Sequence, residues 1–236
     1  TEIAQNQSAP TFKEEIRTEE GDVVIKYEAG DTVICNLASI NVAKVNTIEE
    51  MAKIFPIITR ALDNVISLNA YPVEEARISA EKYRAIGIGY MWVAEWFATN
   101  KMNYWDEDSV KAIDKLFRQY TYHTLKASCD LAKERGAYPA YQGSDFSKWI
   151  AYGRDISSFE TDEDDNIWRD WTDLQEDIMT YWVRFGYHSA PAPNTSTAWV
   201  VWTTAWVVPI YKRFFVETNQ LAPTVTVAPN LSTDNF

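Results

Sequence analysis

The stretch Thr32-Val-Ile-Cys-Asn-Leu-Ala-Ser-Ile-Asn41 is apolar, contains several β-branched residues and follows the turn signal Gly30-Asp31. An apolar run of this length bounded by turn residues predicts a buried strand that runs into a loop. Cys35 lies inside this run. A free cysteine in apolar surroundings is more often a small buried hydrophobe than a reactive thiol, so packing and a redox role both stay open at this point.

A long amphipathic helix is predicted directly after the strand. Thr47 and Glu50 have the spacing of a capping box, and apolar residues then recur at helical spacing as far as Ile66. Pro56 is expected to kink this helix. Three further helices are expected over residues 79–97, 108–133 and 168–185. We interpret Gly87 and Gly89 as close-packing positions inside the first of these three.

The other segments are predicted to be less regular. Residues 1–31 are expected to form an irregular region, with a possible edge hairpin around residues 23–25. Residues 189–197 have the proline and hydroxyl content of a loop, and residues 199–208 are rich in strand formers. The tail from residue 223 is expected to be extended. Long helices flanked by isolated buried strands predict a single α/β unit.

The composition excludes several classes of function. The 236 residues carry a formal net charge of −12, which argues against binding to a nucleic acid polymer or to an anionic membrane. There is no apolar run long enough to span a membrane. Cys35 and Cys129 are the only cysteines and form no CxxC pair, which fits a reducing cytoplasm. Two isolated histidines are too few for a metal site.

The loop Asn194-Thr-Ser-Thr197 is the best candidate for ligand binding on composition alone. It offers successive backbone N–H groups and three hydroxyls after two prolines, which is typical of an anion-binding nest, although a plain turn has the same composition. Glu2 by itself is expected to be a solvated charge. Cys129, on a predicted helix, is expected to contribute to packing.

Several stretches, in this order and spacing, resemble the large subunit of aerobic ribonucleotide reductases. They are Val33-Ile-Cys-Asn-Leu-Ala-Ser-Ile-Asn41, Ala61-Leu-Asp-Asn-Val-Ile66 with Tyr71-Pro-Val73, Tyr83-Arg-Ala-Ile-Gly-Ile-Gly89, Ala127-Ser-Cys-Asp-Leu-Ala-Lys-Glu-Arg-Gly136 with Gly143-Ser-Asp145, Ala192-Pro-Asn-Thr-Ser-Thr197, and Pro209-Ile-Tyr-Lys-Arg-Phe-Phe215. The resemblance covers nearly the whole chain. It implies an α/β fold in which residues 1–236 form the C-terminal portion of a ten-stranded α/β barrel, with residues 1–31 as the exit from a finger loop.

The resemblance also implies roles for individual residues. Thr1 and Glu2 look like the last two residues of the family's Asn-Leu-Cys-x-Glu motif, so that Glu2 would be the acid/base at the substrate 3′-hydroxyl and the radical cysteine would come just before Thr1. Cys35 would be one of the two cysteines that reduce the substrate. The substrate phosphate loop would comprise Thr195, Ser196 and Thr197, flanked by Pro193 and Asn194.

The partners implied by the resemblance lie outside the chain. They are the N-terminal part of the same large subunit, a metal-containing small subunit that generates the radical, thioredoxin or glutaredoxin as reductant, and a ribonucleoside diphosphate as substrate, with no cofactor bound directly. A triphosphate substrate and a cobalamin-dependent radical source are alternatives. A second reading is a non-catalytic remnant or assembly module.

The chain departs from the family pattern in two ways. The radical cysteine, the partner thiol, the N-terminal regulatory regions and the C-terminal tyrosine pair and tail thiols are not found in it, so the chain by itself is expected to be inactive. A break directly after the radical cysteine suggests the C-terminal flank of an intein, with a split gene or a truncated record as rivals. In addition, Trp199, Trp202 and Trp206 stand where small polar residues are expected.

Overall fold

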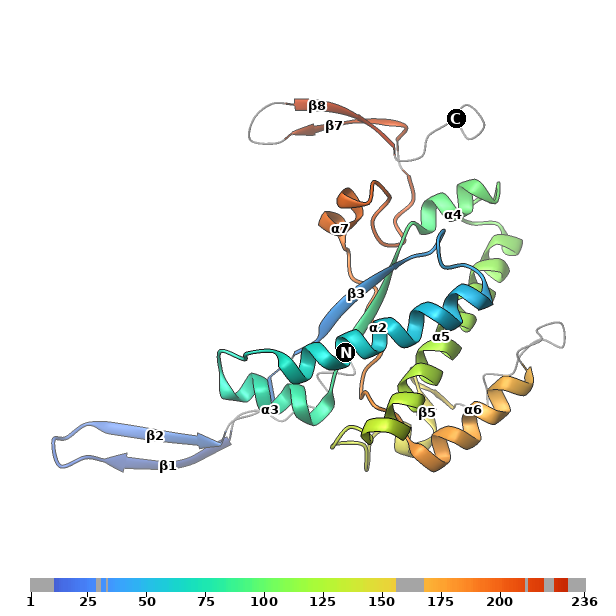
Figure 1. The fold of residues 1–236 in the computed structure, drawn as a ribbon. Coiled ribbons are helices and arrows are strands. Elements are labelled where there is room, and N and C mark those ends of the chain that lie inside the picture. The colour runs from blue at the N-terminus through green and yellow to red at the C-terminus, as the bar shows by residue number, and fades with distance from the viewer. Residues whose placement is uncertain are drawn as a thin grey trace.

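The structure, a computed structural model, describes residues 11–28, 31–32, 34–155, 168–210, 212–218 and 223–228 (Figure 1). The elements follow one another along the chain as β1 (Thr11–Arg17), β2 (Val23–Glu28), β3 (Asn36–Asn41), α2 (Ile48–Leu68), α3 (Glu74–Tyr83), β4 (Ile86–Met91), α4 (Val93–Thr99), α5 (Glu107–Arg135), η1 (Phe146–Lys148), β5 (Ile150–Ala151), β6 (Arg154–Asp155), α6 (Trp168–Tyr181), α7 (Thr195–Val200), β7 (Phe214–Thr218) and β8 (Pro223–Val227).

A parallel strand pair, β3 and β4, lies at the centre of the molecule. The pair runs in register from Asn36 opposite Ile86 to Asn41 opposite Met91, and α2 and α3 form the crossover that parallel strands require. Residues 187–190 extend the pair on the far side of β4. The N–H groups of Ile86 and Ile88 donate to the carbonyls of Tyr187 and His188 at 3.1 and 2.9 Å.

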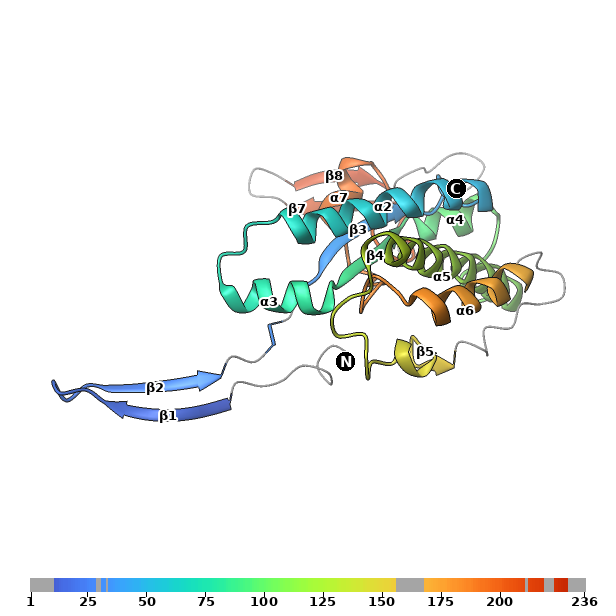
Figure 2. The ribbon, with the colours of Figure 1, turned by 60° about the horizontal axis from the view of Figure 1, so that its bottom comes forward.

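One face of this small sheet packs against α2 and α5 (Figures 1 and 2). Phe55 from α2, Tyr120 from α5 and Ile86 and Ile88 from β4 are fully buried there. The rings of Tyr90 and Tyr120 stack with centroids 5.1 Å apart. A second apolar cluster lies between α5 and α6 and includes Cys129, so the packing role predicted for this thiol is confirmed.

The helix predicted over residues 79–97 is wrong, because this segment forms the end of α3, the strand β4 and the helix α4. The glycines explain the difference. A Cβ on Gly87 would lie 2.5 Å from Leu37 Cδ2 and 2.7 Å from Ala190 Cβ, and one on Gly89 would lie 2.7 Å from the Ala190 carbonyl oxygen. The glycines therefore allow close packing, as expected, but between extended segments rather than between helices.

Several boundaries also differ from the prediction. The strand begins at Asn36 rather than at residue 32, and one of its faces is open, with Leu37 56% exposed. The strand-rich run 199–208 forms no strand: α7 occupies its start and turns follow. The helix expected to end at residue 185 ends at Tyr181.

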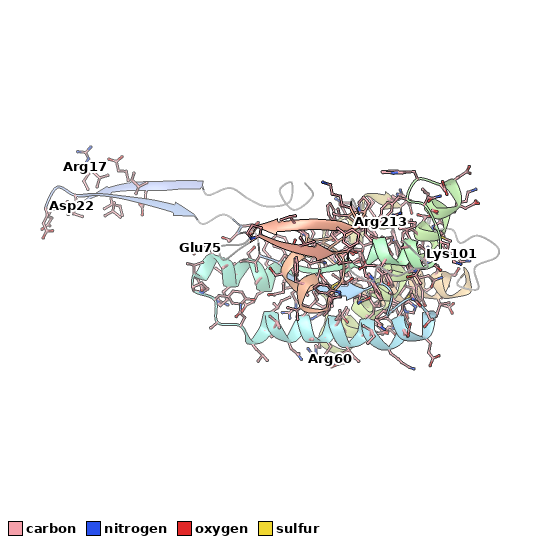
Figure 3. All side chains as sticks on the ribbon, turned by 90° about the horizontal axis from the view of Figure 1, so that it is seen from above. Arg17, Asp22, Arg60, Glu75, Lys101 and Arg213 are labelled. Carbon is pink, nitrogen blue, oxygen red and sulfur yellow. The ribbon has the colours of Figure 1, made fainter. Side chains whose placement is uncertain are left out.

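Two longer antiparallel hairpins are present, one at the edge hairpin suggested around residues 23–25 and one that includes part of the extended tail. The described part of residues 1–31 contains the hairpin β1–β2, which projects far from the body, with Arg17 and Asp22 near its tip (Figure 3). The tail contains β8, which pairs with β7. Turn residues alone do not reveal such pairing, because the partner strand decides it.

The predicted capping box is confirmed. The Thr47 hydroxyl accepts from the Glu50 N–H at 3.2 Å while Glu50 Oε2 accepts from the Thr47 N–H at 3.3 Å. The helix α2 then continues without a break through Pro56. At the C-terminal end of the longest described helix, Gly136 caps α5 with φ of 81°.

We expect Thr47→Ala to lower the free energy of unfolding by about 1 kcal/mol, because it removes the acceptor for an N–H of the first turn. Thr47→Ser keeps that acceptor and serves as the control. Urea unfolding of the two variants measures the difference, and equal midpoints would contradict the capping role.

A buried carboxylate joins four segments of the fold. Asp63 on α2 is fully buried and accepts hydrogen bonds from Arg84 Nη2 at 2.7 Å, Arg135 Nη1 at 2.7 Å and Arg184 Nε at 2.8 Å. Burial raises the pKa of Asp63, but the hydrogen bonds from these arginines outweigh that effect and hold the pKa below its ordinary value. Arg184 also donates to the carbonyls of Arg135 and Gly136 at the end of α5. We refer to these four residues as the Asp63 cluster.

Candidate active site

The open face of the β3–β4 sheet carries the candidate thiol. Side chains alternate along a strand, so Cys35, Leu37 and Ser39 lie on the face opposite to the core. Cys35 is partly exposed and comes directly before β3. A Cβ on Gly87 would lie 3.1 Å from Cys35 Sγ, so the glycine makes the space in which the thiol sits.

Burial raises the pKa of the Cys35 thiol above its ordinary value. At neutral pH this residue is therefore a protonated thiol, with Sγ 3.9 Å from the Asn36 carbonyl oxygen. A protonated thiol on an open face can donate a hydrogen atom or become half of a disulfide. Cys129 cannot be its partner, because it is fully buried in the cluster between α5 and α6.

The second candidate, the segment 189–197, lies across the same sheet. Ala190 is the link: its methyl group lies against Gly87, and its carbonyl oxygen lies against Gly89 beside the Ser39 hydroxyl. The Ala190 N–H donates to the Ile88 carbonyl at 3.2 Å. The loop therefore passes over the strand face on which the Cys35 thiol stands.

Asn194 fixes the end of this loop to the sheet. Its side-chain Nδ2 donates to Ser39 Oγ at 3.1 Å and to the Tyr90 carbonyl at 3.0 Å, and its Oδ1 accepts from the Trp206 N–H at 2.9 Å. The backbone of Asn194 is left-handed, with φ of 35°, which asparagine tolerates better than most residues. Asn194 is therefore a structural clamp, a role that its sequence context did not predict.

We expect Asn194→Ala to lower the free energy of unfolding by about 1–3 kcal/mol, because it leaves the polar partners of the amide unsatisfied. Asn194→Gly accepts the left-handed backbone and also lacks the amide. Comparing the two by urea unfolding separates backbone strain from lost hydrogen bonds. Wild-type stability of Asn194→Gly would show that the amide contributes nothing.

The hydroxyl-bearing residues Thr195, Ser196 and Thr197 form the first turn of α7 and are exposed. The expected nest of successive N–H groups is therefore the start of a short helix, whose first N–H groups have no acceptor within the helix. Pro193, also exposed, precedes the Asn194 clamp. Since Cys35 and Ser39 are four residues apart on one extended segment, the thiol and the Asn194 end of the loop are separated by roughly 13 Å along the sheet.

Glu95 on α4 holds the segment that follows α7, and sequence analysis missed it. The side chain is 2% exposed and accepts from the Thr204 N–H at 2.8 Å and from Thr203 Oγ1 at 3.3 Å, with a further short hydrogen bond from Thr204 Oγ1. Burial raises the pKa of Glu95, and the hydrogen bonds from Thr204 and Thr203 lower it by less. A carboxylate in a helical pattern gives no signal of this role.

The raised pKa of Glu95 predicts how stability depends on pH. An acid whose folded pKa exceeds its unfolded pKa contributes stability that is present below the unfolded pKa and is lost as pH rises through the folded pKa. We therefore expect Glu95→Gln to reduce the loss of stability over the pH range that begins at the ordinary glutamate pKa of about 4 and extends upward. Urea unfolding across this range measures it, and an unchanged slope would contradict the assignment.

A separate hollow of about 290 Å³ lies between residues 138–152 and 186–189, and Cys35 is not among its lining residues. Tyr83, Tyr152 and His188 are among its lining residues. Burial lowers the pKa of His188 to about 3, so its ring is neutral. Across the described ranges, no three His, Cys, Asp or Glu side chains gather as a metal site would require, and none of the helices has the length and apolar character to cross a membrane.

Thr1 and Glu2 fall outside the described residues, so the structure places only part of the predicted site. It brings Cys35 and the segment 189–194 onto one sheet face, with Thr195, Ser196 and Thr197 at its end.

Comparison with known proteins gives consistent matches. Residues 1–234 match the family model described as ribonucleotide reductase, barrel domain. The chain is similar to proteins named ribonucleoside-diphosphate reductase subunit alpha from three bacteria. Identity is 36% over 212 residues for Helicobacter pylori (88% of this chain, 27% of the relative), 38% over 200 residues for Synechocystis sp. (84% and 25%) and 35% over 237 residues for Treponema pallidum (98% and 27%). The chain thus spans about a quarter of the length of these relatives.

Proposed function

Because the chain belongs to the barrel-domain family of ribonucleotide reductases, we propose that it forms part of the catalytic core of a ribonucleoside-diphosphate reductase. The complete enzyme would convert ribonucleotides to 2′-deoxyribonucleotides in the cytoplasm for DNA synthesis. The observation that carries the proposal is the placement of the Cys35 thiol and the loop held by Asn194 on one open sheet face.

Cys35 is proposed as one of two thiols that reduce the substrate. The two thiols supply two electrons and two protons, the 2′-hydroxyl leaves as water, and the two sulfurs join as a disulfide. Since Cys129 is buried elsewhere, the second thiol has to come from another part of the large subunit. The protonated state of Cys35 suits a group that gives up hydrogen.

The loop is proposed to hold the substrate phosphates. Hydroxyls of Thr195, Ser196 and Thr197 are exposed at the start of α7, where N–H groups and hydroxyls together suit an anion. Pro193 and Asn194 would set the position of this turn. A nucleotide lying along the strands would then reach from the loop towards Cys35.

Two further parts of the proposal rest on the resemblance alone. Glu2, with Thr1 beside it, is proposed to take the proton of the substrate 3′-hydroxyl, since deprotonation makes a 3′ radical more electron-rich and helps to expel the 2′-hydroxyl. The radical is proposed to come from a metal-containing small subunit, and thioredoxin or glutaredoxin is proposed to reduce the disulfide.

The test is an assay of deoxynucleotide formation with the complete large subunit, its small subunit, a ribonucleoside diphosphate and thioredoxin. The proposal expects turnover that depends on all four. If the complete subunit binds its partners but forms no deoxynucleotide, the alternative of a non-catalytic assembly module is correct. Replacing the diphosphate by the triphosphate in the same assay decides the substrate class.

A further inference from the structure

Five tryptophans have a backbone conformation that normally belongs to glycine. The φ angles are positive at Trp92 (72°), Trp149 (65°), Trp182 (66°), Trp202 (54°) and Trp206 (51°). In this region the Cβ of an L-residue is crowded by its own backbone, and a bulky residue there is a genuine outlier, whereas glycine adopts it freely. Of the nine non-glycine residues with positive φ in the described ranges, five are tryptophan.

These five positions lie at chain turns, where glycine has a recognised role. Trp92 stands between β4 and α4, and Trp149 is the C-cap of η1. Trp182 directly follows α6, with its N–H donating to the Ile178 carbonyl at 2.9 Å. Trp202 comes two residues after the end of α7, with its N–H donating to the Trp199 carbonyl at 3.2 Å. A left-handed residue just past a helix end is usually glycine. The fold therefore requires turns at these points, and tryptophan does not favour them.

Two of the five side chains bury an indole N–H without a partner and two are largely exposed, although the Trp182 ring stacks on Tyr141 with centroids 5.0 Å apart. The indole N–H groups of Trp92 and Trp206 are buried and have no hydrogen-bond partner among the described residues. Trp182 and Trp202 are 41% and 53% exposed. Trp149 packs partly against the cluster between α5 and α6.

Two of the tryptophans outside this group pack in the core, whereas Trp105 and Trp199 are 88% and 42% exposed. Trp171 is 5% exposed, belongs to the core cluster between α5 and α6, and has its ring centroid 5.3 Å from that of Tyr122. Trp96 packs against Phe97 with centroids 5.3 Å apart. The chain therefore contains tryptophans that serve the core and tryptophans that occupy turns.

The composition points in the same direction. The chain has eight glycines in 236 residues, about half of the average usage of ~7%, and it has ten tryptophans. A fold with many short turns is expected to contain at least ordinary amounts of glycine. An exchange of glycine for tryptophan at turn positions accounts for both the shortage and the excess.

We propose that glycine, not tryptophan, occupies positions 92, 149, 182, 202 and 206 in the protein that the source cell makes. The codon UGA links the two residues, because some genetic codes assign it to tryptophan and others to glycine, whereas UGG specifies tryptophan. Suppose that a gene comes from a cell that reads UGA as glycine. If it is translated with a code that reads UGA as tryptophan, the resulting amino-acid sequence has tryptophan at each such turn. Core tryptophans such as Trp171 would come from UGG.

Two of the five turns lie beside the candidate site, and the residue at each turn is independent of what the site does. The Trp206 N–H donates to Asn194 Oδ1 and the Trp92 N–H donates to the Thr204 carbonyl at 3.0 Å, so both turns hold the segment around α7. Glycine keeps these backbone hydrogen bonds and removes the indoles. Positions 202 and 206 would then carry small residues beside the loop.

The decisive test is the mass of the peptides covering the five positions in the protein isolated from its source cells, together with the gene sequence. We expect glycine at all five and TGA at their codons, with tryptophan and TGG at positions 96 and 171. Tryptophan in those five peptides, or TGG at those five codons, would overturn the proposal whatever the enzyme's activity proves to be.

A second test uses the chain expressed from synthetic genes. Changing all five tryptophans to glycine is expected to raise the thermal midpoint by about 2–4 °C for each relieved position. Trp171→Gly is the matched control and is expected to lower the midpoint, because it empties a core position. A lower midpoint for the five-glycine variant would count against the proposal.

Discussion

Replacing Cys35 by serine in the complete large subunit is expected to abolish sustained deoxynucleotide formation, with a loss on the order of 10³-fold or more, the scale seen when a group that reacts covalently is removed. Serine is close in size and keeps a polar hydrogen, but it cannot form a disulfide. The thiol sits in the space left by Gly87 on an open sheet face, so the substitution requires no repacking.

The measurement combines product formation with a count of titratable thiols after incubation with substrate and without reductant. The unsubstituted enzyme is expected to lose two thiols for each product, and Cys35→Ser none. Cys129→Ala is the control, because Cys129 is buried in the core and takes no part in the proposed chemistry. Turnover by Cys35→Ser at an undiminished rate would show that Cys35 is not a reductant.

Replacing Asp63 by asparagine is expected to lower the free energy of unfolding by about 3–5 kcal/mol, because it leaves buried guanidinium groups without their counter-charge. Side chains of Arg84 and Arg184 are 8% and 12% exposed, so water compensates little for the loss. Denaturant unfolding measures the change. A loss below about 1 kcal/mol would place this cluster among weak surface ion pairs.

Asp114→Asn is the matched control for Asp63→Asn, since it makes the same chemical change in an exposed pair outside the Asp63 cluster. Asp114 pairs with Arg118 on α5 at 2.7 Å, with both side chains close to half exposed, and such pairs contribute about 0–1 kcal/mol. Asp63→Asn should also change how stability responds to acid. The depressed pKa of Asp63 contributes stability above the unfolded pKa, and this stability is lost as pH falls through the folded pKa. Asp63→Asn should therefore reduce the loss of stability at low pH.

Local signals in the sequence predicted those parts of the fold that depend on neighbouring residues. The capping box at Thr47 and the helix that ends at Gly136 both follow from contacts within a few positions. The strand β4 could not be predicted in this way, because the run around Gly87 and Gly89 fits a helix unless Leu37 and Ala190 are known to lie against it. Non-local contacts overrode the local pattern.

The candidate site shows the same division. Sequence analysis identified Cys35 and the hydroxyls at residues 195–197, because their chemistry is visible in their residue types. It took Asn194 only as a flanking residue and missed Glu95, since their roles lie in hydrogen bonds to Ser39 and Thr204, which are distant along the chain. Trp202 and Trp206 were noted as unusual in the sequence, and their φ angles give that observation a physical cause.

The Asp63 cluster also constrains the order in which the polypeptide can reach its native state. Arg184 is 121 positions from Asp63, and Arg135 is 72 positions away. During synthesis, α2 leaves the ribosome long before these two arginines exist, so until then Arg84 is the only member of the cluster that can pair with the Asp63 carboxylate. Closing such long loops is slow. The final locking of α2 against α5 therefore waits for residue 184, and a nascent chain that stops short of it would remain open to chaperones and proteases.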